Sequence, residues 1–232
     1  MEPVAADMSK SLRFHLPPRG TFIANGESDP LRYYYMPLVG RVFTARIETG
    51  LGLLGPGARF RRLLEIGYGS GLLMPTLAPL ADELYGVDIE EEPAGLRATL
   101  ERLGVRPQKL VRADIQELPF PDGHFDGVVA FSILEHLKRE ELERAARELA
   151  RVLEPGGRLL IGCPAVHSFM NAAFAAIGFR NIGHHHFSGI ATVLDVFAPH
   201  FSVEKRAMLP RLLDRAPLGW APYTTVLFTR TC

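Results

Sequence analysis

Strand-like apolar runs alternate with helix-like segments through the middle of this chain, and this alternation limits the folds open to it more than any other feature. The runs LLEI, GVVAF and LLIG, at 63–66, 127–131 and 159–162, are nearly continuous in apolar residues, as in strands buried on both faces. Between them lie helical patterns, clearest at 139–153, where Leu142, Ala145 and Leu149 recur at three- and four-residue spacing. Such alternation predicts βαβ units and a mostly parallel sheet covered on both faces.

The pattern divides the chain into elements and two parts. We predict strands at 60–67, 83–89, 109–114, 127–134 and 158–164, and helices at 72–81, 93–104 and 139–153, the last of these ended by Gly156 and Gly157. Two tail strands, 202–209 and 224–230, have no helix pattern between them and should pair antiparallel. Residues 1–30 are expected to form a loosely ordered arm before an aromatic helical segment at 31–54, so we separate 1–58 from a single globular unit at 59–232.

Composition narrows the class of protein. Lys plus Arg and Asp plus Glu both number 26 among the 232 residues, a balance that argues against a dedicated nucleic-acid or anionic-membrane binder. Two cysteines, Cys163 and Cys232, cannot build a disulfide scaffold, which predicts a reducing, cytoplasmic setting. The N-terminus shows no signal-peptide core, and no uncharged apolar run approaches the roughly 20 residues that span a bilayer.

The stretch RLLEIGYGSGLLMP, residues 62–75, carries Gly67, Gly69 and Gly71 directly after the first predicted strand. Glycines at such a turn let a ligand approach the backbone closely, and the free N–H groups of the next helix point toward it. In open α/β sheets, ligands bind in the crevice at the carboxyl ends of the strands. The sequence therefore predicts a nucleotide-type pocket around 65–72.

Asp88, at the end of the second predicted strand, follows Gly67 by 21 residues. A carboxylate at that place can accept both hydroxyls of a ribose, although an aspartate there can also cap the next helix. The third glycine comes one residue too early for the pyrophosphate fingerprint, and a phosphate loop with Lys and Ser/Thr is absent. An adenosine-containing cofactor is thus expected, but Asp88 alone does not show which one.

An ordered set of segments narrows that choice. Glu65 before G-x-G-x-G, Asp88 in GVDI, ADIQELPFPDGHFD at 113–126 and ELARVLEPGGRLLI at 148–161 occur in that order. Together they resemble the class I S-adenosylmethionine-dependent methyltransferases of the small-molecule type, over residues 60–163. The resemblance implies a Rossmann-like, doubly wound sheet of seven strands, mostly parallel with an antiparallel last strand and with helices on both faces. It also implies S-adenosylmethionine as methyl donor, S-adenosylhomocysteine as product, no metal, and an N-terminal part that folds over the site.

The resemblance gives cofactor-binding roles to ten residues: Glu65, Gly67, Tyr68, Gly69, Gly71, Asp88, Ile89, Asp114, Ile115 and Phe131. It implies that the glycines pass close to the methionine part and the ribose, and that Glu65 supports the loop or meets the ammonium group. A buried acid paired with Arg61 or Arg62 is the plainer alternative for Glu65. The ring of Tyr68 is expected to turn outward or to line the pocket mouth.

On the adenine side, the same resemblance places Ile89 against the ring, Asp114 on its amino group and the backbone N–H of Ile115 on the ring edge. Asp114 could instead be a turn residue. Phe131 is expected near the methyl-donor end.

Candidates for chemistry and for substrate contact are less specific. His136, in ILEHL just after the fourth predicted strand, is the best candidate for a general base, against a surface histidine at a helix start. Of the adjacent Tyr33, Tyr34 and Tyr35, one is expected to pack inward, and Tyr33 or Tyr34 could cover a sulfonium through a cation–π contact. His167, in the apolar stretch 164–180, and His185, in a run of three histidines, are candidate substrate contacts. Adjacent histidines without a carboxylate or cysteine at ligand spacing do not indicate a metal site.

These observations predict methyl transfer to an oxygen, nitrogen or carbon nucleophile of a small molecule, by a monomer or homodimer. The substrate is expected to be neutral or weakly acidic, with an aromatic or apolar body. The segment AFSILEH lacks the Asn/Asp-Pro-Pro-aromatic run of family members that methylate base or glutamine amide nitrogens, which together with the zero net charge argues against nucleic acid as a partner. The balanced charge and the lack of a long apolar run make a membrane an unexpected partner as well. Two alternatives stay open: an NAD(P)-dependent oxidoreductase, and a non-catalytic module that binds S-adenosylmethionine.

Overall fold

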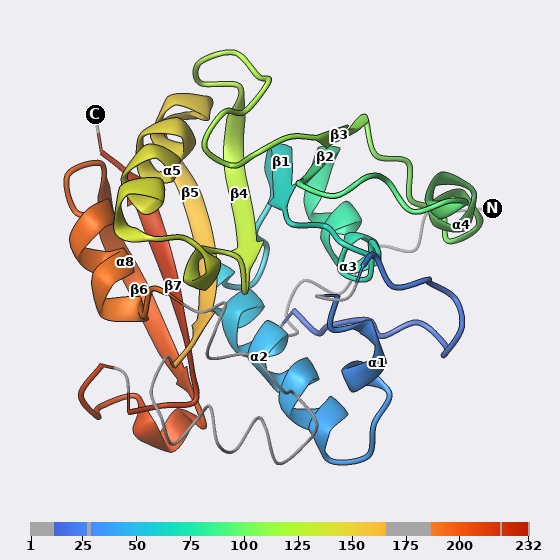
Figure 1. The fold of residues 1–232 in the computed structure, drawn as a ribbon, viewed down its shortest axis with the longest axis horizontal. Helices are drawn as coiled ribbons and strands as arrows, with labels where there is room; N and C mark the ends of the chain where they lie inside the picture. Colours follow the sequence, from blue (N-terminus) through green and yellow to red (C-terminus); the bar gives the residue numbers. More distant parts are fainter. Residues whose placement is uncertain (1–11, 27–28, 166–186, 219, 232) are drawn as a thin grey trace.

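The computed structural model describes residues 12–26, 29–165, 187–218 and 220–231. Within them one sheet holds seven strands in the order β3-β2-β1-β4-β5-β7-β6 (Figure 1). The strands are β1 Phe60–Ile66, β2 Ala81–Asp88, β3 Lys109–Arg112, β4 Phe125–Phe131, β5 Leu153–Pro164, β6 Phe201–Leu209 and β7 Tyr223–Arg230. β1 to β5 pair in parallel, whereas β7 runs antiparallel to both β5 and β6. The expected fold class is confirmed.

Helices cover both faces of this sheet. They are α1 Leu31–Tyr34, α2 Val39–Leu54, α3 Met74–Leu77, α4 Leu96–Arg102, α5 Arg139–Val152 and α8 Ile190–Phe197, with 3-10 turns η1 Ala78–Leu80, η2 Leu134–His136 and η3 Arg211–Leu213. One buried cluster joins β1 to α2, α3 and α4 through Leu63, and the other joins β1 to α5 and α8 through Leu64, because successive strand residues face opposite sides. None of the described helices is long and apolar enough to cross a membrane.

Two predicted element boundaries are wrong, for identifiable reasons. The helix predicted at 72–81 shortens to one turn of α3 followed by η1, because Pro79 lacks the N–H that would continue an α-helix and restricts the residue before it. Gly156 does not end α5, which stops at Val152. Leu153 is already extended and pairs with Phe125, so the glycines lie inside β5.

The N-terminal arm packs more closely than its sequence predicted. Phe14 and Phe22 are buried in the same cluster as α2, and the hydroxyl of Tyr35 donates to the carbonyl of Pro17 at 2.9 Å. A Cβ on Gly71 would lie 3.6 Å from the ring of Phe22. The described part of the arm is therefore anchored against the glycine loop by aromatic side chains.

Gly40, in the first turn of α2, lets α1 approach that helix. A Cβ there would lie 2.2 Å from the carbonyl oxygen of Tyr34, and a backbone atom cannot move aside cheaply. Gly40→Ala should therefore lower the free energy of unfolding by about 1–3 kcal/mol, as overpacking does.

Gly52 on the same helix is the matched control, because a Cβ there meets no atom within 4 Å. Gly52→Ala should raise the stability by about 0.5–1 kcal/mol, through helix propensity alone. Urea unfolding of both variants checks this pair, and equal effects would contradict the close approach of α1 to α2.

Candidate functional site

The glycine loop that follows β1 turns in a backbone region that side chains disfavour. Gly67, Gly69 and Gly71 have φ of +73°, +49° and +81°, values that favour glycine. The N–H of Gly67 donates to the carbonyl of Val87 on β2 at 2.7 Å. A Cβ on Gly67 would lie 2.1 Å from Cδ1 of Ile133, so the loop is held tightly between the end of β2 and the segment after β4.

Asp88, at the carboxyl end of β2, binds this loop. Its Oδ2 accepts from the N–H of Gly69 at 2.7 Å, and its Oδ1 accepts from the N–H of Glu90 at 2.9 Å. Each carboxylate oxygen retains a further lone pair, so this geometry leaves room for two more donors. Ile89 follows directly and is 63% exposed, an apolar surface beside the carboxylate.

Glu65 lies on β1 between Gly86 of β2 and Val129 of β4. Its side chain is buried, and Oε2 has no hydrogen-bond partner among the residues that the structure describes. Burial, and secondly the charge of Asp88, raises the pKa of this carboxyl well above its ordinary value.

The alternative of a pair between Glu65 and a neighbouring arginine is not found. Arg61 pairs instead with Glu154 and Asp126, and Arg62 contacts the ring of His124. Glu65 is thus a buried acid beside the glycine loop, and its Oε2 has no donor among the described residues.

Tyr68 turns inward, so the first of its two expected placements, an outward ring, is wrong, and the second, a ring that lines the pocket mouth, stays a prediction. The side chain is 3% exposed, and a Cβ on Gly86 would lie 2.9 Å from its Cδ1. Glycine inside β2 leaves the space that this ring occupies. Burial, with the charge of Asp88, raises the pKa of Tyr68 to about 12.

The remaining predicted cofactor residues lie around the same edge of the sheet. Asp114, after β3, is half-buried and accepts from the N–H of Gln116 at 2.9 Å. This bond is typical of a turn residue, the alternative role considered for Asp114. The side chain of Ile115 is buried among the residues under α5. Phe131 ends β4, and Cβ atoms on Gly50 of α2 or Gly162 of β5 would each lie 2.6 Å from its ring.

A cavity of about 270 Å³ opens beside the glycine loop. Phe22 and Ile23 of the arm, Ser70 of the loop and Thr99 of α4 contribute to its walls. The arm and the loop therefore line the same half-open cavity.

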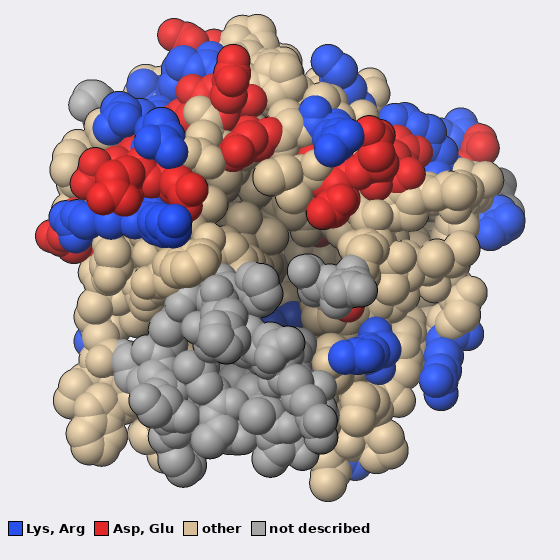
Figure 2. Space-filling view, in the orientation of Figure 1, with Lys and Arg blue, Asp and Glu red and all other residues tan. Residues whose placement is uncertain are grey.

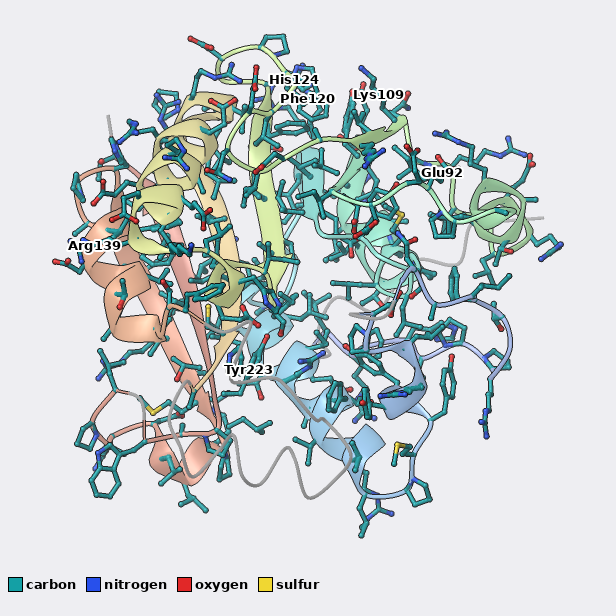
Figure 3. The ribbon with its side chains drawn as sticks, in the orientation of Figure 1. Glu92, Lys109, Phe120, His124, Arg139 and Tyr223 are labelled. Atoms are coloured by element: carbon teal, nitrogen blue, oxygen red, sulfur yellow. The ribbon has the colours of Figure 1, made fainter. Side chains whose placement is uncertain are left out.

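Sequence reasoning missed a polar cluster, named here the Arg46 cluster, which comprises Tyr34, Arg46, Ser132, Glu135 and Tyr223. Arg46 of α2 donates through Nη1 to Oγ of Ser132 and through Nη2 to the hydroxyl of Tyr34, each at 3.1 Å. Ser132 Oγ also lies 3.0 Å from the hydroxyl of Tyr223. Figure 3 places Tyr223 below the end of β4, far from Phe120 and His124 at the opposite end of the sheet.

Glu135 belongs to this cluster through charge. It is 1% exposed, and its carbonyl accepts from the N–H of Phe187 at 2.7 Å. Its Oε2 has no hydrogen-bond partner within the described ranges of the chain. Burial raises the pKa of Glu135 to about 8, and its own backbone N–H and Arg46 offset that effect only in part. The sequence pointed to this place in the chain, because Glu135 is the neighbour of His136, the predicted general base.

His136 itself is exposed on η2, and its N–H donates to the carbonyl of Ile133 at 3.1 Å. The tight turn directs Glu135 inward and His136 outward.

Among the candidate substrate contacts, Tyr33 and Tyr34 are both buried, whereas only one tyrosine was expected to pack inward. The ring of Tyr33 stacks on Phe43 with centroids 5.6 Å apart, and that of Tyr34 lies 5.5 Å from Phe14. The reason is that α1 is a single turn between the arm and α2, with apolar neighbours on both sides. His167 and His185 lie outside the described residues.

Comparison with known proteins gives three kinds of match. A family profile described as a methyltransferase domain matches residues 64–161. Phosphatidylethanolamine N-methyltransferase of Cereibacter sphaeroides is 39% identical over 106 residues, which are 45% of this chain and 51% of that protein. The ubiquinone/menaquinone biosynthesis C-methyltransferase UbiE of Azotobacter vinelandii is 36% identical over 109 residues, 44% of this chain and 42% of that protein. The chain therefore spans about half the length, or less, of these relatives.

Solved structures match over more of the chain. N-methyltransferase NodS from Bradyrhizobium japonicum WM9, in complex with S-adenosylhomocysteine, aligns with a TM-score of 0.61 and 20% identity over 89% of this chain and 94% of that one. Geranyl diphosphate methyltransferase, in complex with GPP and sinefungin, aligns with a TM-score of 0.64 and 18% identity over 89% of this chain and 84% of that one. At these identities the likeness shows the shared fold.

Glu135 gives a pH-dependent prediction. Its folded pKa of about 8 stands above the ordinary glutamate value of 4.5, so folding favours the protonated carboxyl, and stability should fall as pH rises from about 4.5 to about 8. Glu135→Gln removes this titration. The variant should therefore gain stability relative to the parent by about 1.4 kcal/mol per pH unit across that window.

Urea unfolding at pH 5, 7 and 9 measures the difference. Glu140→Gln, at an exposed position of α5, is the control, and its free energy of unfolding should follow that of the parent at every pH. If the free energy of unfolding of Glu135→Gln changes with pH in the same way as that of the parent, Glu135 is not buried as described.

Proposed function

This chain belongs to the class I S-adenosylmethionine-dependent methyltransferases, and from that premise we propose that it transfers a methyl group to an oxygen, nitrogen or carbon nucleophile of a small molecule. The observation that carries the proposal is the bond between Asp88 and Gly69. It joins a bare backbone loop to a carboxylate at the carboxyl ends of neighbouring parallel strands, the place where open α/β sheets bind adenosine-containing ligands.

The residues present fit S-adenosylmethionine. Gly67 and Gly69 have positive φ values and leave the loop backbone without side chains, and Asp88 can accept the two hydroxyls of a ribose. The apolar side chain of Ile89 is exposed next to it and suits the face of an adenine, with Asp114 and the backbone of Ile115 at the ring edge. Phe131 stands toward the methyl-donor end.

Glu65 supplies a specific reason for a cationic ligand. A buried carboxyl with an unpartnered oxygen is costly, and a positively charged donor at that place would both satisfy the oxygen and favour its ionised form. An ammonium group fits this requirement. We assign Glu65 the amino end of the cofactor, directly or through the loop it supports.

When bound, S-adenosylmethionine supplies a methyl group on a positively charged sulfur. The chain's own contribution is to orient the acceptor and to exclude water. Holding two reactants in line can lower a barrier by about 7–11 kcal/mol. The aromatic arm and α1 pack beside the glycine loop, which suits a cover over the site formed by part of the 1–58 segment.

A small-molecule acceptor is supported by the relatives at 36–39% identity, whose names describe an N-methyltransferase of phosphatidylethanolamine and a C-methyltransferase of quinone biosynthesis. The equal numbers of acidic and basic residues also suit a small acceptor better than a nucleic acid. Neither feature selects the accepting atom.

Asp88→Ala tests this proposal. Loss of a charged hydrogen-bond acceptor should weaken binding of S-adenosylhomocysteine by roughly 1.5–3 kcal/mol, measured by titration calorimetry. Asp82→Ala, at the exposed beginning of the same strand, should bind like the parent. Circular dichroism verifies that the variant keeps its fold, and an unchanged dissociation constant for Asp88→Ala would place the ribose elsewhere.

A further inference from the structure

Arg46 lacks a counterion in the described part of the chain. Its guanidinium donates to two neutral hydroxyls, of Tyr34 and Ser132, and its Nε is buried with no hydrogen-bond partner. None of the ion pairs found among the described residues includes it. A guanidinium in a protein interior normally meets a carboxylate or phosphate, and among the described residues Arg46 forms an ion pair with neither.

Three aromatic rings surround this cation. The guanidinium carbon lies 4.1 Å from the ring centroid of Phe43, 5.5 Å from that of Tyr223 and 5.7 Å from that of Tyr34. Rings at this range favour a cation and present flat apolar surface around it. The surroundings thus suit an acid group attached to an aromatic or apolar body.

Glu135 does not supply the missing charge at neutral pH. Its pKa of about 8, raised by burial, leaves it largely protonated. Burial alone would lower the pKa of Arg46, but Tyr34, Tyr223 and, to a smaller extent, the charge of Glu135 raise it above its ordinary value, so the guanidinium stays charged. In the described part of the chain this positive charge lies in a half-buried place and forms no ion pair.

Ser132, which holds Arg46, has a strained backbone. Its φ is +58°, a region that residues other than glycine rarely adopt, and its N–H donates to the carbonyl of Gly162 on β5 at 2.7 Å. Strain of this kind concentrates where a side chain must be aimed at a ligand. Here it directs Oγ toward Arg46 and Tyr223.

The cluster occupies a different half of the sheet edge from Asp88. Ser132 follows β4 and bonds to β5, and Tyr223 begins β7, whereas Asp88 ends β2, on the other side of β1. In Figure 1 the arrow of β4 ends beside α2, the helix that carries Arg46. Figure 2 shows the molecule in the same orientation, with a hollow near the middle of the face in view and most charged side chains above that hollow.

We propose that Arg46 is the anion-binding residue of the acceptor site, and that the acceptor is a small carboxylic acid with an aromatic or apolar body. The inference rests on the proposed function and narrows its substrate class. The carboxylate binds the guanidinium among Tyr34, Phe43 and Tyr223, while the adenosyl group occupies the β1–β2 half of the edge.

The probes are benzoate and its neutral isostere benzamide, titrated by calorimetry or NMR into protein saturated with S-adenosylhomocysteine. The parent should bind benzoate roughly ten- to a hundredfold more tightly than benzamide, the effect of a charged hydrogen bond. Arg46→Met should abolish this preference, and Arg46→Lys should retain part of it. Arg41→Met, on an exposed turn of the same helix, should keep the full preference.

Tyr34→Phe is a milder variant that keeps the buried ring and removes one of the hydroxyls that hold Arg46. It should reduce the benzoate preference severalfold without unfolding the protein. The proposal is overturned if the parent binds benzoate no better than benzamide, or if Tyr34→Phe and Arg46→Met leave the preference intact.

A second titration compares S-adenosylhomocysteine with methylthioadenosine, which lacks the carboxylate. Their affinity ratio should not change in Arg46→Met. A tenfold loss for S-adenosylhomocysteine alone would show that Arg46 binds the carboxylate of the cofactor, which overturns the acceptor assignment but leaves methyl transfer intact. Failure of the parent to bind S-adenosylhomocysteine at all would instead overturn the proposed function.

Discussion

The carboxylate of Asp88 ties the end of β2 to the loop after β1, and the arrangement of the site depends on that bond. Its two oxygens accept from Gly69 and Glu90, which fixes a loop that glycine alone can follow through three positive φ values. The same carboxylate lies close enough to Glu65 to raise its pKa further. One side chain thus fixes the loop and adds to the effect of burial on the pKa of Glu65.

Electrostatics divides the carboxyl edge of the sheet into two halves of opposite character. The β1–β2 half holds two buried acids, Glu65 and Asp88, beside bare backbone. The half formed by β4, β5 and β7 holds the charged Arg46 among aromatic rings, and burial there raises the pKa of Glu135 to about 8. A positively charged donor on the first side and an anionic acceptor on the second would each meet the charge that it needs. This complementarity is what connects the two proposals.

The sequence predicts those parts that depend on local pattern. Alternating apolar runs specify the sheet, helical spacing specifies α5, and the position of Asp88 at a strand end anticipates its contact with the loop. The turn of Tyr68 into the space over Gly86 was missed, although a glycine inside a predicted strand is a signal for close packing. The burial of Glu135 beside the exposed His136 depends on the phase of one 3-10 turn, which apolar spacing does not reveal.

Long-range assembly accounts for what no local pattern could provide. Arg46 and Ser132 are 86 residues apart, and Ser132 and Tyr223 are 91 apart, so their meeting follows from strand order and from the packing of α2. The packing of the arm was missed for another reason. Its prolines and glycines indicate a loosely ordered segment, whereas Phe14 and Phe22 anchor it to the core.

The most direct measurement is a crystal structure of the full chain grown with S-adenosylhomocysteine. The account predicts density for the ligand along the glycine loop, with both ribose hydroxyls within hydrogen-bond distance of Asp88 and the amino group on the side of Glu65. Density in another place, or an empty crevice at saturating ligand, would contradict it.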